Sequence, residues 1–306
     1  MESHAQITVA INGFGNVGRA LLQSLLQFRS VPLTILVYDV DTSVAGSILD
    51  LRQAAAIEGF HAVFFNTYDM RHTARVIFHS AGKAIPKGQS RDAMLHQNII
   101  TAQHIYYSWQ FHPDAVIVNV TNPVEPMCAV LSVITGLSPN RVIGVGTQIE
   151  TGRLRFHFSN LLNIGFSRIH TMVVGEHGDA MVPLLSQCTI DGVNVRLVLD
   201  DFLIQDCVYE TRMSAQRIKG SGAVSCFAAA TAAANLLFDL AAGSVSAHKP
   251  ATVWDDDLGA FCGLVCSLGR FTWHAEPIEV ELEEARALRS AQSLIFEKTK
   301  NALALV

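Results

Sequence analysis

The glycine-rich segment 13–18 constrains the fold of this chain more than any other feature. It reads Gly-Phe-Gly-Asn-Val-Gly and matches the pattern G-x-G-x-x-G. It directly follows an apolar, strand-like run at 7–11 and opens the segment 17–28, whose apolar residues recur at helical spacing. A strand, a glycine turn and a helix in this order are typical of the first part of a dinucleotide-binding βαβ unit.

Each position of this turn has a physical role. Gly13 permits the tight turn, Gly15 lets the backbone approach a pyrophosphate, and Gly18 lets the helix pack closely on the strand. The helix N-terminus attracts phosphate groups. We therefore expect Asn16 and Val17, between the last two glycines, to contact the cofactor as well. The alternative is a purely structural turn.

A carboxylate follows the second strand at the spacing that such a unit requires. The apolar run 33–38 ends in Asp39, where an acidic side chain binds the ribose hydroxyls of a dinucleotide. A carboxylate there repels a 2′-phosphate, so NAD is favoured over NADP. The alternative for Asp39 is an ordinary turn residue at the end of a strand.

Strand-like and helical segments alternate through the first half of the chain. Near-continuous apolar strands separated by helices predict a parallel sheet covered on both faces. The expected fold is therefore α/β, with a Rossmann-type doubly wound parallel sheet. The expected strands are 7–11, 33–38, 62–65, 76–78, 115–120 and 142–145, and the expected helices are 17–28, 91–107 and 124–135.

The second half of the chain changes character. Strand-like pieces come before a long helical block, and the terminal stretch also reads as a helix. This pattern predicts an α+β substrate domain at 147–306 after an NAD-binding domain at 5–146. The strand-like pieces are 168–174 and 187–198, and the helical stretches are 201–242 and 279–303.

Composition limits the partners and the compartment. Half of the residues are apolar, the net charge is −5 and no basic cluster occurs, which argues against a nucleic-acid partner. The Ala-rich run 227–243 is too short and too polar for a membrane span and reads as a buried helix. The start of the chain shows no secretory signal, and the six cysteines lack metal-ligand or disulfide spacing. We expect a cytoplasmic protein with reduced cysteines, no metal and no membrane partner.

The best candidate for chemistry is a histidine between two glycines. Residues 173–179 read Val-Val-Gly-Glu-His-Gly-Asp, so His177 follows an apolar strand-like run. A histidine in such a tight segment can reach a cleft, and the ordinary pKa of imidazole lies near neutrality. His177 is therefore a candidate proton donor and acceptor. The alternative is a turn histidine whose hydrogen bonds are satisfied.

Four motifs now stand in order, each near the end of a strand. The Ala-Gly pair at 81–82 leads to Gln-Ser-Arg at 89–91, and Thr-Asn-Pro-Val-Glu occupies 121–125. Gly-Val-Gly-Thr-Gln-Ile-Glu-Thr-Gly-Arg occupies 144–153, before the histidine segment. From residue 7 to about residue 225, this order closely resembles the lactate/malate dehydrogenase family of NAD-dependent L-2-hydroxy-acid dehydrogenases.

The resemblance implies a role for each matching residue. His177 would exchange the proton, Arg153 would clamp the substrate carboxylate, and Arg91 would close over the site on a lid at 82–91 and polarise the carbonyl. Asn122 would lie beside the nicotinamide and the substrate oxygen. Ala81 and Gly82 would also contact the cofactor.

Three of these residues have simpler alternatives. Asn122 followed by Pro123 could be a helix N-cap with proline at the first helical position. Arg91 could be a surface arginine, and Arg153 an ordinary helix charge.

The chain departs from the family pattern at Glu150, where the family usually carries aspartate. Glu150 and Arg153 are three residues apart and share one helix face, so Glu150 could pair with His177 while Arg153 addresses the substrate. The rival interpretation is a capping box, Thr147-x-x-Glu150, in which the glutamate turns back to the helix start. From the sequence, we expect Glu150→Asp to preserve or raise activity.

A second departure concerns the substrate. Ile85 takes the lid position that reads the substrate side chain, and Gly222 stands where lactate enzymes commonly have threonine. An apolar and widened pocket predicts a 2-oxo acid with an alkyl or aryl side chain, because an unpaired second carboxylate is costly to bury. The alternative is a malate dehydrogenase in which Lys87 contacts the second carboxylate.

Two further expectations complete the picture. The resemblance and the low charged fraction suggest a homodimer or homotetramer that acts on a small 2-oxo or 2-hydroxy acid. An alternative of a different class is a family member that binds NAD(H) with weak or no catalysis, and the atypical Glu150 is its support.

Overall fold

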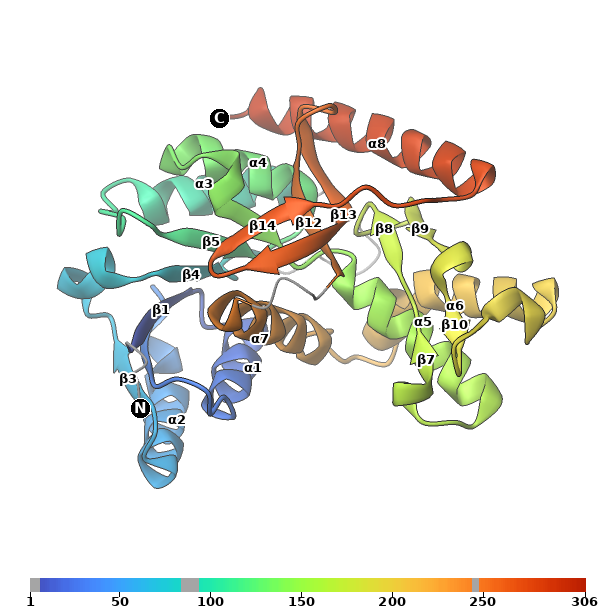
Figure 1. Ribbon diagram of the computed structural model, residues 1–306. Coiled ribbons are helices and arrows are strands. Elements are labelled where there is room, and N and C mark those ends of the chain that lie inside the picture. The colour runs from blue at the N-terminus through green and yellow to red at the C-terminus, as the bar shows by residue number, and fades with distance from the viewer. Residues whose placement is uncertain (1–5, 84–93, 244–247) are drawn as a thin grey trace.

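The computed structural model describes residues 6–83, 94–243 and 248–306 (Figure 1). Six parallel strands form the first part of one large sheet in the order β3-β2-β1-β4-β5-β6. This order confirms the predicted Rossmann-type doubly wound sheet. The strands are β1 (Ile7–Asn12), β2 (Leu33–Tyr38), β3 (Ala62–Phe65), β4 (Val76–His79), β5 (Val116–Asn119) and β6 (Val142–Gly144).

The order of the strands reverses at β1, which pairs with β2 on one side and β4 on the other. In open α/β sheets, ligands bind outside the carboxyl ends of the strands at such a reversal. The glycine turn 13–18 follows β1, and residues 81–82 lie just beyond β4. The topology thus brings two predicted cofactor segments to the same edge of the sheet.

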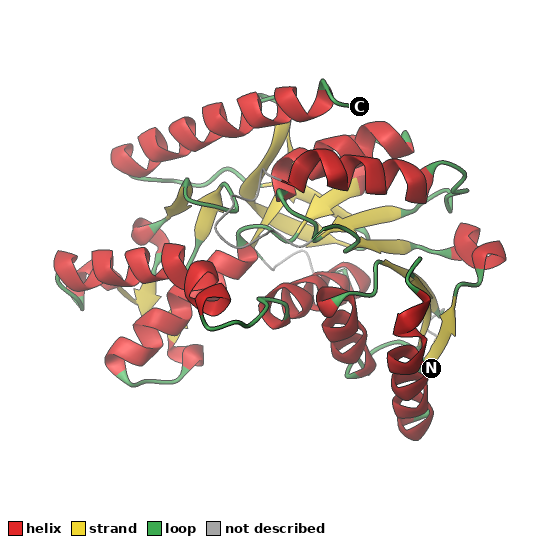
Figure 2. Cartoon of the chain, turned by 180° about the vertical axis from the view of Figure 1, so that it is seen from behind, coloured by secondary structure: helices red, strands yellow, loops and turns green. Residues whose placement is uncertain are grey.

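Helices cover both faces of the sheet (Figures 1 and 2). The core on one face contains apolar side chains of α1, α2 and α7, and the core on the other contains those of α3 and α4, against which α8 also packs. The helices of the first half are α1 (Asn16–Leu26), α2 (Ala45–Glu58), α3 (Leu95–Tyr106) and α4 (Val124–Thr135). The predicted helix at 124–135 is confirmed at both ends.

The sheet continues into the second half of the chain. There, β12 (Lys249–Asp255) pairs antiparallel with β6 and with β13 (Ala260–Gly269). Beyond β13, the sheet ends in β8 (Val173–Gly175) and β9 (Met181–Pro183), and β14 (Thr272–Ala275) also pairs with β13. A separate small sheet contains β7 (Ile169–His170), β10 (Thr189–Ile190) and β11 (Val193–Asn194). The sequence analysis did not identify the strands at 249–275. The division at residue 147 stays a prediction.

The predicted single helical block at 201–242 is wrong. It is two helices, α6 (Asp201–Gly220) and α7 (Phe227–Ala242), separated by a loop in which Gly222 has a φ of +82°. A residue in the left-handed region ends a helix, and glycine adopts that conformation at little cost. The alanine-rich α7 is largely buried, as predicted, and packs against α1.

Two other helices frame the second half. The helix α5 (Gln148–Leu162) carries Glu150 and Arg153. The terminal helix α8 (Leu282–Leu303) begins later than predicted, at a capping box between Glu281 and Glu284.

A buried polar cluster lies at the carboxyl ends of β1 and β4. Asn12 donates from Nδ2 to the Tyr106 hydroxyl at 3.1 Å, and that hydroxyl lies 3.3 Å from Nδ1 of His79. His79 is fully buried, and desolvation lowers its pKa to about 3. The ring is therefore neutral in the folded protein at physiological pH.

All six cysteines are free and buried, and burial raises the pKa of the Cys128 and Cys262 thiols. Among the described helices, none combines the length and the apolar character that crossing a membrane requires.

Candidate active site

The glycine turn fits a dinucleotide. Gly13 has a φ of +91°, and a Cβ added there would lie 2.4 Å from the Cα of Ala81. A Cβ on Gly18 would lie 2.2 Å from the Gly13 carbonyl oxygen, whereas one on Gly15 would meet no atom of the described residues within 4 Å. Gly13 and Gly18 are therefore required by packing, and the open space is at Gly15. Among the described residues, no side chain caps the start of α1, and free N–H groups at a helix start suit an anionic ligand.

Asp39 lies beside this turn, directly after β2. Its Oδ2 accepts from the Phe14 backbone N–H at 2.5 Å, and its Oδ1 accepts from the Asp41 N–H at 2.8 Å. The carboxylate is thus held against the glycine turn at the carboxyl edge of the sheet. Asn16 is exposed and Val17 half-buried at the first turn of α1. Asn16 and Val17, with Gly15 and Asp39, could hold NAD.

Residues 81–82 and Asn122 approach the same edge from β4 and β5. A Cβ on Gly82 would lie 2.9 Å from Thr121 Cγ2, so Gly82 packs closely on the next loop. Asn98 ties the two loops together, donating to the Asn122 carbonyl at 2.8 Å and accepting from the Lys83 N–H at 2.8 Å.

The alternative role of Asn122 as a helix N-cap is wrong. Helix α4 begins at Val124, and Pro123 occupies the N-cap position. Among the described residues, the buried Oδ1 of Asn122 has no hydrogen-bond partner. An unsatisfied buried amide oxygen at this edge fits a ligand that supplies a donor.

The histidine segment meets helix α5. Nδ1 of His177 lies 2.7 Å from Oε2 of Glu150, and both side chains are almost fully buried. Helix α5 begins without a side-chain capping bond, so the capping-box interpretation of Glu150 and Thr147 is not what the structure shows. Because the residues between β8 and β9 form a tight turn, the ring is presented at the end of a strand.

Arg153 shares the carboxylate of Glu150. Its Nη1 donates to Oε1 of Glu150 at 2.9 Å, and its Nη2 lies 3.3 Å from the Ser225 hydroxyl. The Arg153 side chain is only 11% exposed. Glu150 thus bridges the predicted proton-transfer group and the predicted carboxylate clamp.

Other carboxylates surround the turn that carries His177. The His177 backbone N–H donates to Oε1 of Glu125 at 2.8 Å, and Glu125 is buried in the first turn of α4. Glu176 pairs with Lys298 of α8 at 2.8 Å. The turn is therefore tied to both α4 and α8.

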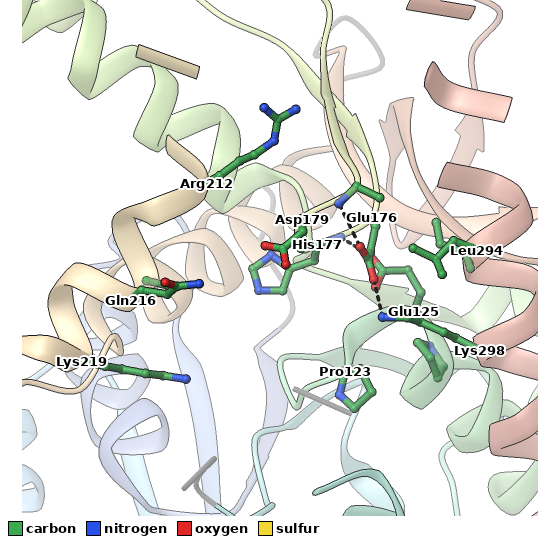
Figure 3. A pocket seen from close by; sticks show the side chains of 15 residues that line it. Pro123, Glu125, Glu176, His177, Asp179, Arg212, Gln216, Lys219, Leu294 and Lys298 are labelled. Atoms are coloured by element: carbon green, nitrogen blue, oxygen red, sulfur yellow. Dashed lines mark hydrogen bonds and ion pairs between the residues drawn. The ribbon is translucent and has the colours of Figure 1, made fainter. Parts of the chain in front are cut away.

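A cavity of about 470 Å³ opens beside His177 (Figure 3). Gln216 and Lys219 of α6 lie across the cavity from Glu176 and Lys298, with His177 between them. The cavity is large enough for a substrate of several carbons.

The lid positions lie outside the described residues. These are Ile85, Lys87 and Arg91. Gly222 is exposed, and a Cβ there would meet no atom of the described part of the chain within 4 Å, although its φ of +82° would strain a threonine. Gly222 is not among the residues that line the cavity beside His177, so the widened pocket expected from the sequence stays a prediction.

Sequence reasoning missed three residues of this region: Glu125, Ser225 and Lys298. Glu125 could have been identified from the sequence, because it directly follows Asn-Pro-Val at 122–124. Lys298 is 122 positions from Glu176 and gave no local signal. Among the described residues, no cluster of three or more histidine, cysteine or acidic side chains could hold a metal ion.

Comparison with known proteins identifies the family of the chain. A family model described as "lactate/malate dehydrogenase, NAD binding domain" matches residues 7–144. The chain is 31% identical to a malate dehydrogenase of Synechocystis sp. over 98% of this chain and 95% of that protein. It is 29% identical to L-lactate dehydrogenase A of Rhizopus oryzae over 94% of this chain and 90% of that protein.

Solved structures show the same fold. The structure of a malate dehydrogenase from Plasmodium falciparum superposes with a TM-score of 0.89 at 21% identity, covering 98% of this chain and 99% of that one. From its match to the NAD-binding domain model and its similarity to full-length relatives, the chain belongs to the lactate/malate dehydrogenase family of NAD-dependent oxidoreductases that act on CH–OH groups.

Proposed function

We propose that this protein is an L-2-hydroxy-acid dehydrogenase in which His177 exchanges the substrate proton, Glu150 holds the imidazole and Arg153 binds the substrate carboxylate. The observation that carries the proposal is the bridge formed by Glu150, which contacts both His177 and Arg153. One buried carboxylate thereby sets the relative position of the proton-transfer group and the substrate clamp.

His177 works as the acid and the base. With Nδ1 engaged by Glu150, Nε2 is the nitrogen that takes the hydroxyl proton during oxidation and returns it to the carbonyl oxygen during reduction. Glu150 fixes the ring orientation and stabilises the imidazolium that forms.

Arg153 orients the substrate. A planar guanidinium binds a carboxylate through two parallel hydrogen bonds, which fixes the orientation of C2. Its pairing with Glu150 and its contact with Ser225 restrict the conformations available to the guanidinium before substrate binds. The family resemblance assigns Arg91 to the reacting oxygen.

The cofactor is NAD, and Gly15, Asp39 and Asn122 are the residues best placed to hold it. When bound, NAD⁺ supplies the acceptor for the hydride that leaves C2, and NADH supplies the donor in the reverse direction.

The proposed substrate is a 2-oxo acid with an apolar side chain larger than methyl. Ile85 offers no partner for a second carboxylate, and a glycine at position 222, where lactate enzymes commonly have threonine, would leave room for added carbon atoms. Because each buried methylene contributes only about 1–3 kcal/mol of discrimination, the preference is broad.

Malate and oxaloacetate form the second candidate pair. The observation that favours them is the presence of Arg212 and Lys219 in the lining of the cavity beside His177. A second carboxylate placed near these cations would be stabilised, with Lys87 as a further contact.

Steady-state NADH oxidation with four acids tests the proposal: pyruvate, oxaloacetate, 2-oxoisocaproate and phenylpyruvate. The proposal predicts the highest kcat/KM with 2-oxoisocaproate or phenylpyruvate. Fastest turnover of oxaloacetate would establish the second candidate. Absence of turnover with all four, in a preparation that binds NADH, would leave a binding protein and refute the dehydrogenase.

A further inference from the structure

The main chain of His177 has its own anchor, distinct from the anchor of its ring. Glu150 contacts the imidazole at Nδ1, whereas Glu125 accepts the backbone N–H of the same residue at 2.8 Å. Thr252 donates to the same Glu125 oxygen at 3.4 Å. Glu125 is 2% exposed, so it is a buried carboxylate at a backbone donor.

A carboxylate in this position needs compensation. Removing an ionised carboxyl group from water costs several kcal/mol unless hydrogen bonds and charges replace its hydration. Glu125 is in the first turn of α4, where the partial positive charge of the helix N-terminus stabilises an anion. The helix end and the two donors together make the buried side chain tolerable.

The location of Glu125 joins two parts of the site. It is three residues after Asn122, at the carboxyl edge of the NAD-binding half of the sheet, and it contacts a turn in the second half. Glu125 thus joins the cofactor edge of the sheet directly to the His177 turn.

Glu176 fixes the flanks of the turn rather than the His177 N–H. Glu176 accepts the Ala180 N–H at 3.1 Å and pairs with Lys298, which fixes the flanks of the turn (Figure 3). The His177 N–H itself donates to Glu125.

We propose that Glu125 is a positioning residue that fixes the main chain of His177 relative to the cofactor edge, acting through its hydrogen-bond acceptor rather than through its charge. The inference rests on the proposed function of His177. Displacement of a reacting group by about 1 Å can cost on the order of a hundredfold in rate.

Two conservative substitutions of Glu125 distinguish the effect of its acceptor position from the effect of its charge. Glu125→Gln keeps the length and an acceptor oxygen but removes the charge. Glu125→Asp keeps the charge but withdraws the acceptor by about one C–C bond, about 1.5 Å. The proposal predicts that kcat falls by about tenfold to a hundredfold in Glu125→Asp and by less than about threefold in Glu125→Gln, with an unchanged Kd for NADH in both.

The pH dependence of kcat/KM in the two variants distinguishes a positional role of Glu125 from an electrostatic one. The proposal predicts an unshifted profile in Glu125→Gln. The reverse pattern, a shifted profile and a large loss in Glu125→Gln with near wild-type kcat in Glu125→Asp, would show an electrostatic role and overturn the proposal. Wild-type kcat in both variants would overturn it as well.

Amide hydrogen exchange at His177, measured in the NADH complex, tests the anchor without relying on turnover. Exchange should be faster in Glu125→Asp than in the wild type and in Glu125→Gln, and equal rates in all three proteins would refute the anchor. Because this readout is independent of turnover, an inactive wild-type enzyme would refute the proposed function while the anchor is still decided.

Glu284 provides a matched control. It is also a buried glutamate that accepts a backbone N–H, that of Ser186 at 2.9 Å, but it belongs to the start of α8 and does not line the cavity. Glu284→Gln and Glu284→Asp should change thermal stability and leave kcat within about twofold. A loss of kcat in Glu284→Asp as large as in Glu125→Asp would show that the effect is generic and overturn the proposal.

Discussion

At the scale of the residue, the site depends on where the extra methylene of Glu150 is accommodated. The glutamate reaches Nδ1 of His177 at 2.7 Å and Nη1 of Arg153 at 2.9 Å, which are ordinary charge-assisted distances. The surrounding structure has therefore absorbed the added length, and the site is built around glutamate.

This geometry reverses the expectation drawn from the sequence for Glu150→Asp. An aspartate would withdraw both oxygens by about 1.5 Å, and His177 and Arg153 would each lose a close partner. We predict a fall in kcat/KM of about tenfold to a hundredfold, measured by NADH oxidation with the best 2-oxo acid. Equal or higher activity in Glu150→Asp would show that the site relaxes around the shorter side chain.

At the scale of the element, different glycines of the turn between β1 and α1 serve packing and cofactor binding. A Cβ on Gly13 would overlap Ala81 in a left-handed backbone, whereas a Cβ on Gly15 would enter open space. The two glycines therefore serve different purposes although they belong to one motif.

Alanine substitution at Gly13 should lower stability, whereas alanine substitution at Gly15 should weaken NADH binding. Gly13→Ala should lower the free energy of unfolding by at least about 2 kcal/mol. Gly15→Ala should leave the melting temperature nearly unchanged but weaken NADH binding by about tenfold or more, or about 1.4 kcal/mol. Thermal denaturation and NADH fluorescence titration measure the two effects. Unchanged NADH affinity in Gly15→Ala would refute the assignment of the open space to the cofactor.

At the scale of the whole molecule, the buried His79 makes stability depend on pH. The pKa of His79 in the folded protein is about 3, below its ordinary value of 6.5. Between these two pH values, His79 is protonated in the unfolded chain but neutral in the folded protein. The stabilising contribution is therefore fully present above about pH 6.5 and is lost as the pH falls towards 3.

Between pH 7 and pH 5, this linkage should cost the wild type about 2 kcal/mol. Urea denaturation of the wild type and of His79→Phe at both pH values isolates the effect, because other titrating groups are common to both proteins. The variant should lose less stability on acidification. Identical losses in the two proteins would contradict a neutral, buried His79.

Sequence patterns predicted the parallel half of the sheet well, because strands such as 33–38 are continuous apolar runs between helices. The hairpin of β12 and β13 was missed, although the turn 255–259 ends in a glycine with a φ of +68°. Its strands pair with β6 and β8, which are distant in sequence, and no local pattern encodes such partners.

The candidate site divides in the same way. His177, Glu150 and Arg153 belong to motifs with fixed local spacing, and the structure brings all three together. Glu125 meets His177 across 52 positions of sequence, and the contact depends on the packing of α4 against the second half of the chain. Local patterns identify the chemical groups, whereas the contacts that position them arise from tertiary packing.

The central claim is that His177 carries the substrate proton, and single-turnover measurement of NADH oxidation by the wild type and His177→Asn tests it most directly. With the best 2-oxo acid of the panel, we predict that the variant binds NADH as tightly as the wild type and oxidises it about 10²–10⁴-fold more slowly. A rate within a few fold of the wild type in His177→Asn would contradict the account.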